Sequence, residues 1–204
     1  MRTLLALIVG MTCVMGTAYG QEHVGAGRVE IGAFPGGGIF FGTGTDDTVP
    51  NFGNYALGAS VTLNFNKWIG VEGEIGGGVG IRQDFTFNAA TLTHQKTPNM
   101  LAYSGNLVVN PIGNDRLVVP YVVGGLGGLT LLSDSAVRNL GVIANETYLS
   151  GNIGGGVKWF ATRHIGLSGD ARFIAVKNRD EAPFFGQQNN RYGVRFHGGL
   201  VLTY

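Results

Sequence analysis

The sequence of 204 residues has little cysteine, little net charge and few long apolar runs. Its one cysteine, Cys13, lies in the first apolar segment, so the rest of the chain cannot be a disulfide scaffold. Its 14 basic and 13 acidic residues nearly cancel, and they do not indicate a nucleic-acid partner. Beyond that first segment no apolar run reaches the roughly 20 residues of a membrane-spanning helix. If the chain crosses a membrane, it must therefore do so as a closed barrel, because lipid cannot satisfy an open sheet edge.

The N-terminus has the pattern of a secretory signal peptide. Arg2 is followed by a short apolar stretch, and small residues stand at Ala18 and Gly20, the third and first positions before Gln21. We expect cleavage after Gly20, which leaves residues 21–204 as one domain. The loss of Arg2 would also balance the side-chain charges.

The last thirteen residues, 192–204, alternate with period 2, which is typical of a strand with two unlike faces. The alternate parity, with His197 and Arg195, is polar or small. Such a strand is long enough to cross a bilayer when tilted, which takes about 9–11 residues. It resembles the closing strand of an outer-membrane barrel. Its apolar parity consists of Tyr192, Val194, Phe196, Gly198, Leu200, Leu202 and Tyr204.

Eight segments of this kind are expected, and the connections between them alternate in length. The predicted strands are 28–41, 52–65, 68–81, 97–110, 116–132, 146–160, 164–177 and 192–204. Three connections are tight, at 64–67, 111–115 and 161–163, and four are long and polar, at 42–51, 82–96, 133–145 and 178–191. Short turns opposite long loops are a hallmark of outer-membrane barrels. The sequence thus predicts an all-β fold, an eight-stranded antiparallel up-and-down transmembrane β-barrel with both termini in the periplasm.

Glycine and the aromatic residues fit this prediction. Glycine makes up 36 of 204 residues and stands among Val, Ile, Leu and Phe, which indicates strand glycines suited to a crowded barrel interior rather than disorder. Aromatic residues gather at both ends of the strands, as membrane interfaces select. At the tight-turn end these are Phe65, Trp68, Trp159, Phe160 and Tyr204, and near the long loops they are Phe40, Phe41, Phe52, Tyr55, Phe85, Phe87, Tyr148 and Tyr192.

Two neighbouring segments carry a family resemblance. Residues 154–160, a glycine-rich strand ending in Lys158, Trp159 and Phe160, precede 164–172, which carries an Asp170-x-Arg172 pair. This arrangement resembles the sixth and seventh strands of small OmpA/OmpX-type outer-membrane β-barrels. The resemblance implies the bacterial outer membrane and says almost nothing about activity. The peptidoglycan-binding domain of full-length OmpA-like proteins is not seen, so we expect no cell-wall tethering.

Charged residues within the predicted strands keep to one parity, which we expect to face the lumen. Because an eight-stranded barrel is only just wide enough for its own side chains, they are expected to form an ion-pair plug. A gated ion path through the same residues is the alternative. The set comprises Arg28, Glu30, Glu72, Glu74, Lys158, Asp170, Arg172, Arg195 and His197.

Catalytic and metal-binding patterns are weak. Glu72 and Glu74 lie on one face of a predicted strand, a spacing that would suit an acid/base pair, but the basic residues of the predicted lumen set can compensate their charges. His164 and Ser168 would be roughly 13 Å apart on one strand, too far for a nucleophile and its base. No metal-ligand spacing links the four histidines, His23, His94, His164 and His197, and the glycine-rich stretches lack a Gly-Lys dipeptide, so no cofactor is expected.

The function expected from the sequence is that of a structural or interaction protein, not an enzyme, whose long external loops make its contacts with a ligand that the sequence does not identify. The alternatives are a narrow ion or small-solute channel and a lipid-modifying outer-membrane enzyme. We expect outer-membrane lipid and the barrel-assembly machinery, through the C-terminal strand, as partners of a monomeric barrel.

Overall fold

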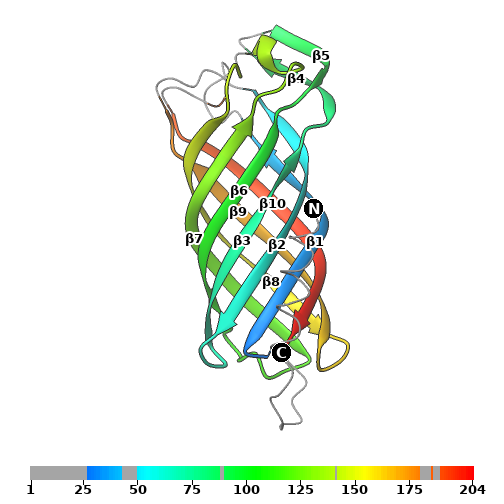
Figure 1. Cartoon of the computed structure of the whole chain (residues 1–204), viewed down its shortest axis with the longest axis vertical. Helices are drawn as coiled ribbons and strands as arrows, with labels where there is room; N and C mark the ends of the chain where they lie inside the picture. The colour runs from blue at the N-terminus through cyan, green and yellow to red at the C-terminus, as the bar shows by residue number, and fades with distance from the viewer. Residues whose placement is uncertain (1–26, 43–49, 88–89, 141, 180–184, 186–188) are drawn as a thin grey trace, which may run out of the picture.

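A computed structural model of the chain describes residues 27–42, 50–87, 90–140, 142–179, 185 and 189–204. Eight strands close into an antiparallel barrel in the order β1-β10-β9-β8-β7-β6-β3-β2 (Figure 1). The fold predicted from the sequence is thus confirmed. The barrel strands are β1 (Val29–Phe41), β2 (Phe52–Asn64), β3 (Ile69–Val79), β6 (Asn99–Val109), β7 (Val118–Leu132), β8 (Glu146–Phe160), β9 (Ile165–Val176) and β10 (Arg191–Thr203).

The tight connections all lie at one end of the barrel, together with the start of β1 and the end of β10 (Figure 1). Between β2 and β3 the Asn66 side chain accepts hydrogen bonds from the backbone N–H groups of Trp68 and Ile69, at 2.8 and 2.9 Å. This is the turn chemistry for which asparagine is favoured. Between β6 and β7, Gly113 has a φ of 82°, a conformation that favours glycine.

At the opposite end, a hairpin of β4 (Arg82–Phe87) and β5 (Ala90–Lys96) forms a separate two-stranded sheet, which projects beyond the barrel in Figure 1. The sequence predicted a polar loop over 82–96, and that prediction was wrong. Phe85 is buried, and Phe87 and Leu92 pack against the apolar residues at this end of the lumen. The hairpin forms because tertiary contacts cover apolar residues that are too few to give a clear strand pattern. The short 3-10 helix η1 (Arg138–Leu140) lies in the next long connection.

The two faces of each barrel strand differ as the parity predicted. On β10 the residues Tyr192, Val194, Phe196, Leu200 and Leu202 are all exposed on the outer wall, as is Tyr204 directly after the strand. The alternate residues, such as Arg195 and His197, are buried in the lumen. The barrel closes where β1 meets β10. There the backbone N–H of Val29 donates to the carbonyl oxygen of Tyr204 at 3.1 Å, and the N–H of Tyr204 donates to that of Val29 at 2.9 Å. An apolar outer wall around a polar lumen is the arrangement of a membrane barrel.

The predicted aromatic girdle at the long-loop end is only partly correct. Phe40, Tyr55 and Tyr192 are exposed on the outer wall. Other aromatics point inward, where they form what we call the loop-end cluster. Its buried aromatic members are Phe41, Phe52, Phe85, Tyr148 and Phe185. At the tight-turn end Phe160 is also buried, whereas Phe65, Trp68, Trp159 and Tyr204 are exposed.

A bulge interrupts β1 near its middle. Its register with β10 shifts between Ala33 and Gly36, and its register with β2 shifts between Phe34 and Gly38. Pro35, which has no N–H to donate to a ladder, lies in this interval. The hydroxyl of Tyr55 donates to the carbonyl oxygen of Pro35 from the outer wall.

Among the described residues, no helix is long and apolar enough to span a membrane. The predicted signal peptide, residues 1–20, lies outside the described part of the chain, as do most of the predicted loops at 42–51 and 178–191.

Candidate functional site in the barrel lumen

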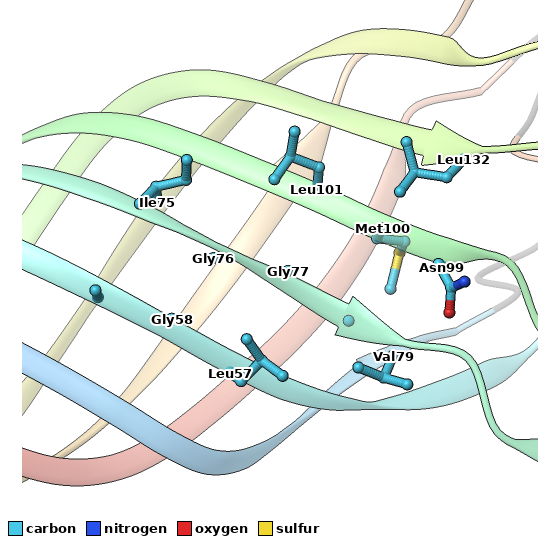
Figure 2. A pocket seen from close by; sticks show the side chains of 12 residues that line it. Leu57, Gly58, Ile75, Gly76, Gly77, Val79, Asn99, Met100, Leu101 and Leu132 are labelled. Carbon is cyan, nitrogen blue, oxygen red and sulfur yellow. The ribbon is translucent and has the colours of Figure 1, made fainter. Parts of the chain in front are cut away.

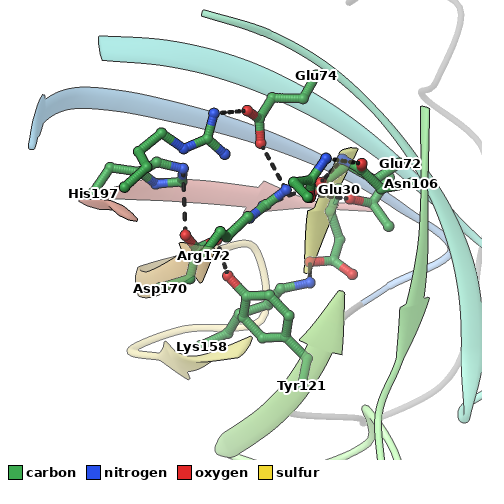
Figure 3. Close-up of polar contacts among 12 residues, drawn as sticks. Glu30, Glu72, Glu74, Asn106, Tyr121, Lys158, Asp170, Arg172 and His197 are labelled. Carbon is green, nitrogen blue, oxygen red and sulfur yellow. Dashed lines mark hydrogen bonds and ion pairs between the residues drawn. The ribbon is translucent and has the colours of Figure 1, made fainter. Parts of the chain in front are cut away.

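Arg172 on β9 is the centre of the buried charge cluster (Figure 3). Its Nη2 lies 3.2 Å from Glu72 Oε1 and 2.9 Å from Asp170 Oδ2. Its Nη1 lies 3.1 Å from Glu74 Oε2. The planar guanidinium presents five donors in a fixed fork, so a single arginine can join three carboxylates where a lysine could not do so with the same geometry.

The register of β9 and β10 brings two cations side by side, because Arg172 is directly paired with Arg195. Like charges in this position repel. Glu74 on β3 offsets the repulsion by contacting both, with its Oε1 at 2.6 Å from Arg195 Nη1. The same register pairs Asp170 with His197, whose Nε2 lies 3.4 Å from Asp170 Oδ1.

Neutral polar side chains complete the cluster. Tyr121 on β7 donates its hydroxyl proton to Asp170 Oδ2 at 2.9 Å. Asn106 on β6 donates to Glu72 Oε1 at 2.9 Å and accepts a bond from Asn152 on β8 at 3.0 Å. These neutral residues were not predicted from the sequence, although they share the inward parity of their strands. Buried carboxylates need such additional donors, because their loss of hydration is costly.

A second ion pair lies nearer the tight-turn end. Lys158 Nζ on β8 is 2.6 Å from Glu30 Oε2 on β1, and Asn64 donates to the other oxygen of Glu30 at 2.6 Å. The Lys158 ammonium also lies 4.9 Å from the centroid of the Tyr121 ring, which links it to the Arg172 group.

Arg28 is the exception among the predicted lumen residues. It is exposed at the tight-turn end, just before β1, and does not take part in the buried cluster. The other eight predicted residues are buried in the lumen, and the contacts above bring them together. Without Arg28, four carboxylates face three permanent cations, and the charges balance when His197 carries a proton.

Little empty space remains between these side chains. An internal cavity between the two ion-pair groups, lined in part by Glu30, Tyr121 and Ser168, has a volume of about 10 Å³. That is the volume of about one water-sized probe. Toward the tight-turn end, Val119, Phe160 and Val201 form a buried apolar layer, and the loop-end cluster forms another at the opposite mouth. The charged layer thus lies between two apolar layers.

The arrangement does not assemble a catalytic pair from the residues considered. Glu72 and Glu74 are both engaged by Arg172. His164 is exposed in a turn, with Nδ1 at 3.1 Å from the carbonyl oxygen of Thr203, whereas Ser168 is buried in the lumen. In the part of the chain that the structure describes, no group of three or more His, Cys, Asp or Glu residues could hold a metal ion.

Comparisons with known proteins agree with this architecture. The model of the outer membrane protein beta-barrel domain family matches residues 4–198. The crystal structure of Neisserial surface protein A is similar, with a TM-score of 0.58 and 12% identity over 88% of this chain and 99% of that one. The N-terminal barrel domain of Pseudomonas aeruginosa OprF has 16% identity over 87% of this chain and 98% of its own, with a TM-score of 0.49. No curated protein sequence matches the chain.

A match over nearly the whole sequence, on a closed barrel with an apolar outer wall, establishes that the chain belongs to the outer membrane protein beta-barrel domain family of the bacterial outer membrane.

Proposed function

We propose that the protein is a structural or interaction barrel whose lumen is plugged and whose long loops make its external contacts. The observation that carries the proposal is the continuous set of ion pairs around Arg172, next to which lies a cavity of only about 10 Å³. An open conducting path needs a file of waters, and the paired side chains around Arg172 argue against one at this level of the lumen.

The long loops are the remaining candidates for a partner site. The hairpin β4–β5 is tied to the β7–β8 connection by Lys96 Nζ, 2.8 Å from Asp134 Oδ2, and by Gln95, which donates to the carbonyl oxygen of Ala136 at 2.9 Å. Contacts of this kind hold a platform above the barrel. We infer that this end faces outward, that the termini lie in the periplasm, and that no catalytic step is involved.

Partners follow from the same proposal. Outer-membrane lipid covers the apolar wall, and β10 presents the aromatic outer face by which the barrel-assembly machinery would handle a C-terminal strand. The barrel acts as a monomer, because its ladder is closed and has no free edge to pair with a second chain.

The test is single-channel recording of the refolded protein in a planar bilayer, with insertion verified by protease protection of the barrel strands. A silent bilayer is expected. Reproducible discrete current steps would overturn the plug and establish the narrow-channel alternative. A change in the mass of lipid A on expression, absent from a strain with empty vector, would instead revive the enzyme alternative.

A further inference from the structure

The hollows of this barrel are of two kinds, apolar ones on the outer wall and a polar one in the lumen. Figure 2 shows an outer hollow of about 630 Å³, where Leu57 and Leu101 flank bare backbone at Gly76 and Gly77. The lumen cavity has a volume of only about 10 Å³ and lies between the two ion-pair groups, with charged and hydroxyl side chains in its wall. Its chemistry therefore suits a small polar occupant.

One hydroxyl in the wall of the lumen cavity has no hydrogen-bond partner. Ser168 is directly opposite Lys158 in the β8–β9 ladder, and only 8% of it is exposed. No residue in the described part of the chain offers its Oγ a hydrogen bond, and Ser168 is the only residue of this cavity wall with such an atom. Because buried hydroxyls are bonded either to protein or to ordered water, the partner of Ser168 belongs in the cavity.

Two charged groups in the same wall have hydrogen-bonding capacity to spare (Figure 3). Of the three protons on Lys158 Nζ, one goes to Glu30 Oε2 at 2.6 Å and a second can face the Tyr121 ring, whose centroid is 4.9 Å away, which leaves a third. Glu72 Oε2 accepts only a long hydrogen bond, from Thr62 Oγ1 at 3.5 Å. A donor, an acceptor and a hydroxyl thus surround this space, and a buried water needs about 2–4 such partners.

A small cation is the competing occupant, because the charged layer has one more carboxylate than cations when His197 is neutral. The Lys158 ammonium lies in the cavity wall, however, and repels a second cation at this distance. The same ammonium donates a hydrogen bond to a neutral acceptor. Water is neutral, fits the volume, and both accepts and donates.

We propose that the lumen cavity binds one water molecule, which accepts a hydrogen bond from Lys158 Nζ, donates one to Glu72 Oε2 and shares one with Ser168 Oγ. The water joins the Glu30–Lys158 pair to the Arg172 group, so that the buried charges form one network. This proposal rests on the plugged lumen of the proposed function and adds a component to it.

The position of the cavity keeps this water inside the barrel. Val119, Phe160 and Val201 form the apolar layer toward the tight-turn end, and the loop-end cluster closes the opposite mouth. The water therefore exchanges with solvent only when the plug opens. It is a resident part of the plug and not one member of a conducting file.

High-resolution crystal structures of the refolded barrel, grown with rubidium in place of sodium, test the proposal. The wild type should show one density peak within hydrogen-bonding distance of Lys158, Glu72 and Ser168, with no anomalous signal from rubidium. Ser168→Val, which removes the hydroxyl and fills the cavity, should lose the peak. The matched control is Ser104→Val, the same change on the lumen face of β6 at a residue that does not line the cavity, and it should keep the peak.

Each other outcome overturns the proposal. A wild-type cavity without a peak refutes the water site, an anomalous signal assigns the site to a cation, and a peak that persists in Ser168→Val removes Ser168 from it. If Ser168→Val does not show the heat-modifiable gel mobility of a folded barrel, cross-peaks between water and the amide of Ser168 in NMR spectra of the wild type decide instead, and their absence refutes a resident water. None of these failures touches the plug itself, which only current steps in the planar bilayer would overturn.

Discussion

Arg172 is the residue on which the lumen cluster depends most, because it contacts three carboxylates on two strands. Arg172→Ala should lower the free energy of unfolding by about 3–5 kcal/mol, since it leaves buried carboxylates without their partner. The urea midpoint of refolded protein in detergent measures this. Arg28→Ala is the control, because Arg28 is exposed and outside the cluster. Equal midpoints for Arg172→Ala and the wild type would show that the plug adds no stability.

The glycines of β3 differ in the space around them, which gives a second prediction. A Cβ on Gly77 would lie 1.9 Å from the backbone oxygen of Met100, whereas one on Gly73 meets nothing within 4 Å. Gly77→Ala should destabilise the barrel by about 1–3 kcal/mol, as overpacking does. Gly73→Ala should be neutral or stabilise the barrel by up to about 1 kcal/mol, because alanine restricts the conformational freedom of the unfolded chain. Thermal unfolding followed by circular dichroism compares the two, and the opposite ranking would contradict the packing described.

Glycine therefore has two uses in this wall. Some glycines permit close approach of neighbouring strands, and others lie beneath an outward aromatic ring, as Gly53 does under Phe40. The sequence-based interpretation placed the glycines in the crowded barrel interior and did not include those that lie beneath aromatic rings on the outer wall. Aromatic rings over glycines restore packing on an outer wall that would otherwise be thin.

At the scale of elements, the contact between the β4–β5 hairpin and the β7–β8 connection depends on pH. The hydrogen bond from Lys96, together with one from the backbone N–H of Ala136, holds the pKa of Asp134 below its ordinary value of 3.8. A carboxyl whose pKa is lowered by folding stabilises the folded contact at pH values above its ordinary pKa. This stabilisation is lost as the pH falls through the lower pKa of the folded state. The contact should thus persist at neutral pH and loosen only below about pH 4.

An NMR titration of the amides of β5 and η1 in micelles measures this dependence. The titration midpoint should lie below the ordinary aspartate value of 3.8. Asp134→Asn should remove the transition. A midpoint above the ordinary aspartate value would show that the salt bridge to Lys96 does not form in solution.

For the whole molecule, closure of β1 on β10 is the feature that makes a barrel of the chain. Ile31 and Leu202 are directly opposite each other in this seam, and both side chains face outward. Cysteines at facing positions are close enough for a disulfide. In residues 21–204, which lack cysteine, Ile31→Cys with Leu202→Cys should form an intramolecular disulfide that changes gel mobility under denaturing, non-reducing conditions.

The matched control is Ile31→Cys with Val194→Cys, because Val194 is opposite Phe40 on the same seam. This pair should remain reduced. If both pairs oxidise equally, the register of the seam is not the one described, and if neither does, the barrel is not closed there.

The alternation of apolar and polar residues was sufficient to predict eight strands and to place Glu72, Asp170 and Arg195 on the polar face of theirs, because period 2 is a local property of a strand. The prediction that the apolar face is the outer one depended instead on the aromatic residues at the ends of the strands. The lengths of the connections similarly predicted which ends of the strands lie together. These features depend on neighbours in the sequence and need no knowledge of the fold.

Only the tertiary structure decided which charges meet. Glu72 is a hundred residues from Arg172 in sequence, and the stagger of the strands in the closed barrel brings the two together. The same holds for Arg28, whose parity is that of the lumen but whose position before β1 places it outside. Phe41 and Phe52 face inward because loop residues cover the barrel mouth, and the hairpin forms because that mouth buries Phe85. Local pattern determined each strand and its faces, while register and long-range burial determined what the lumen and the outer wall contain.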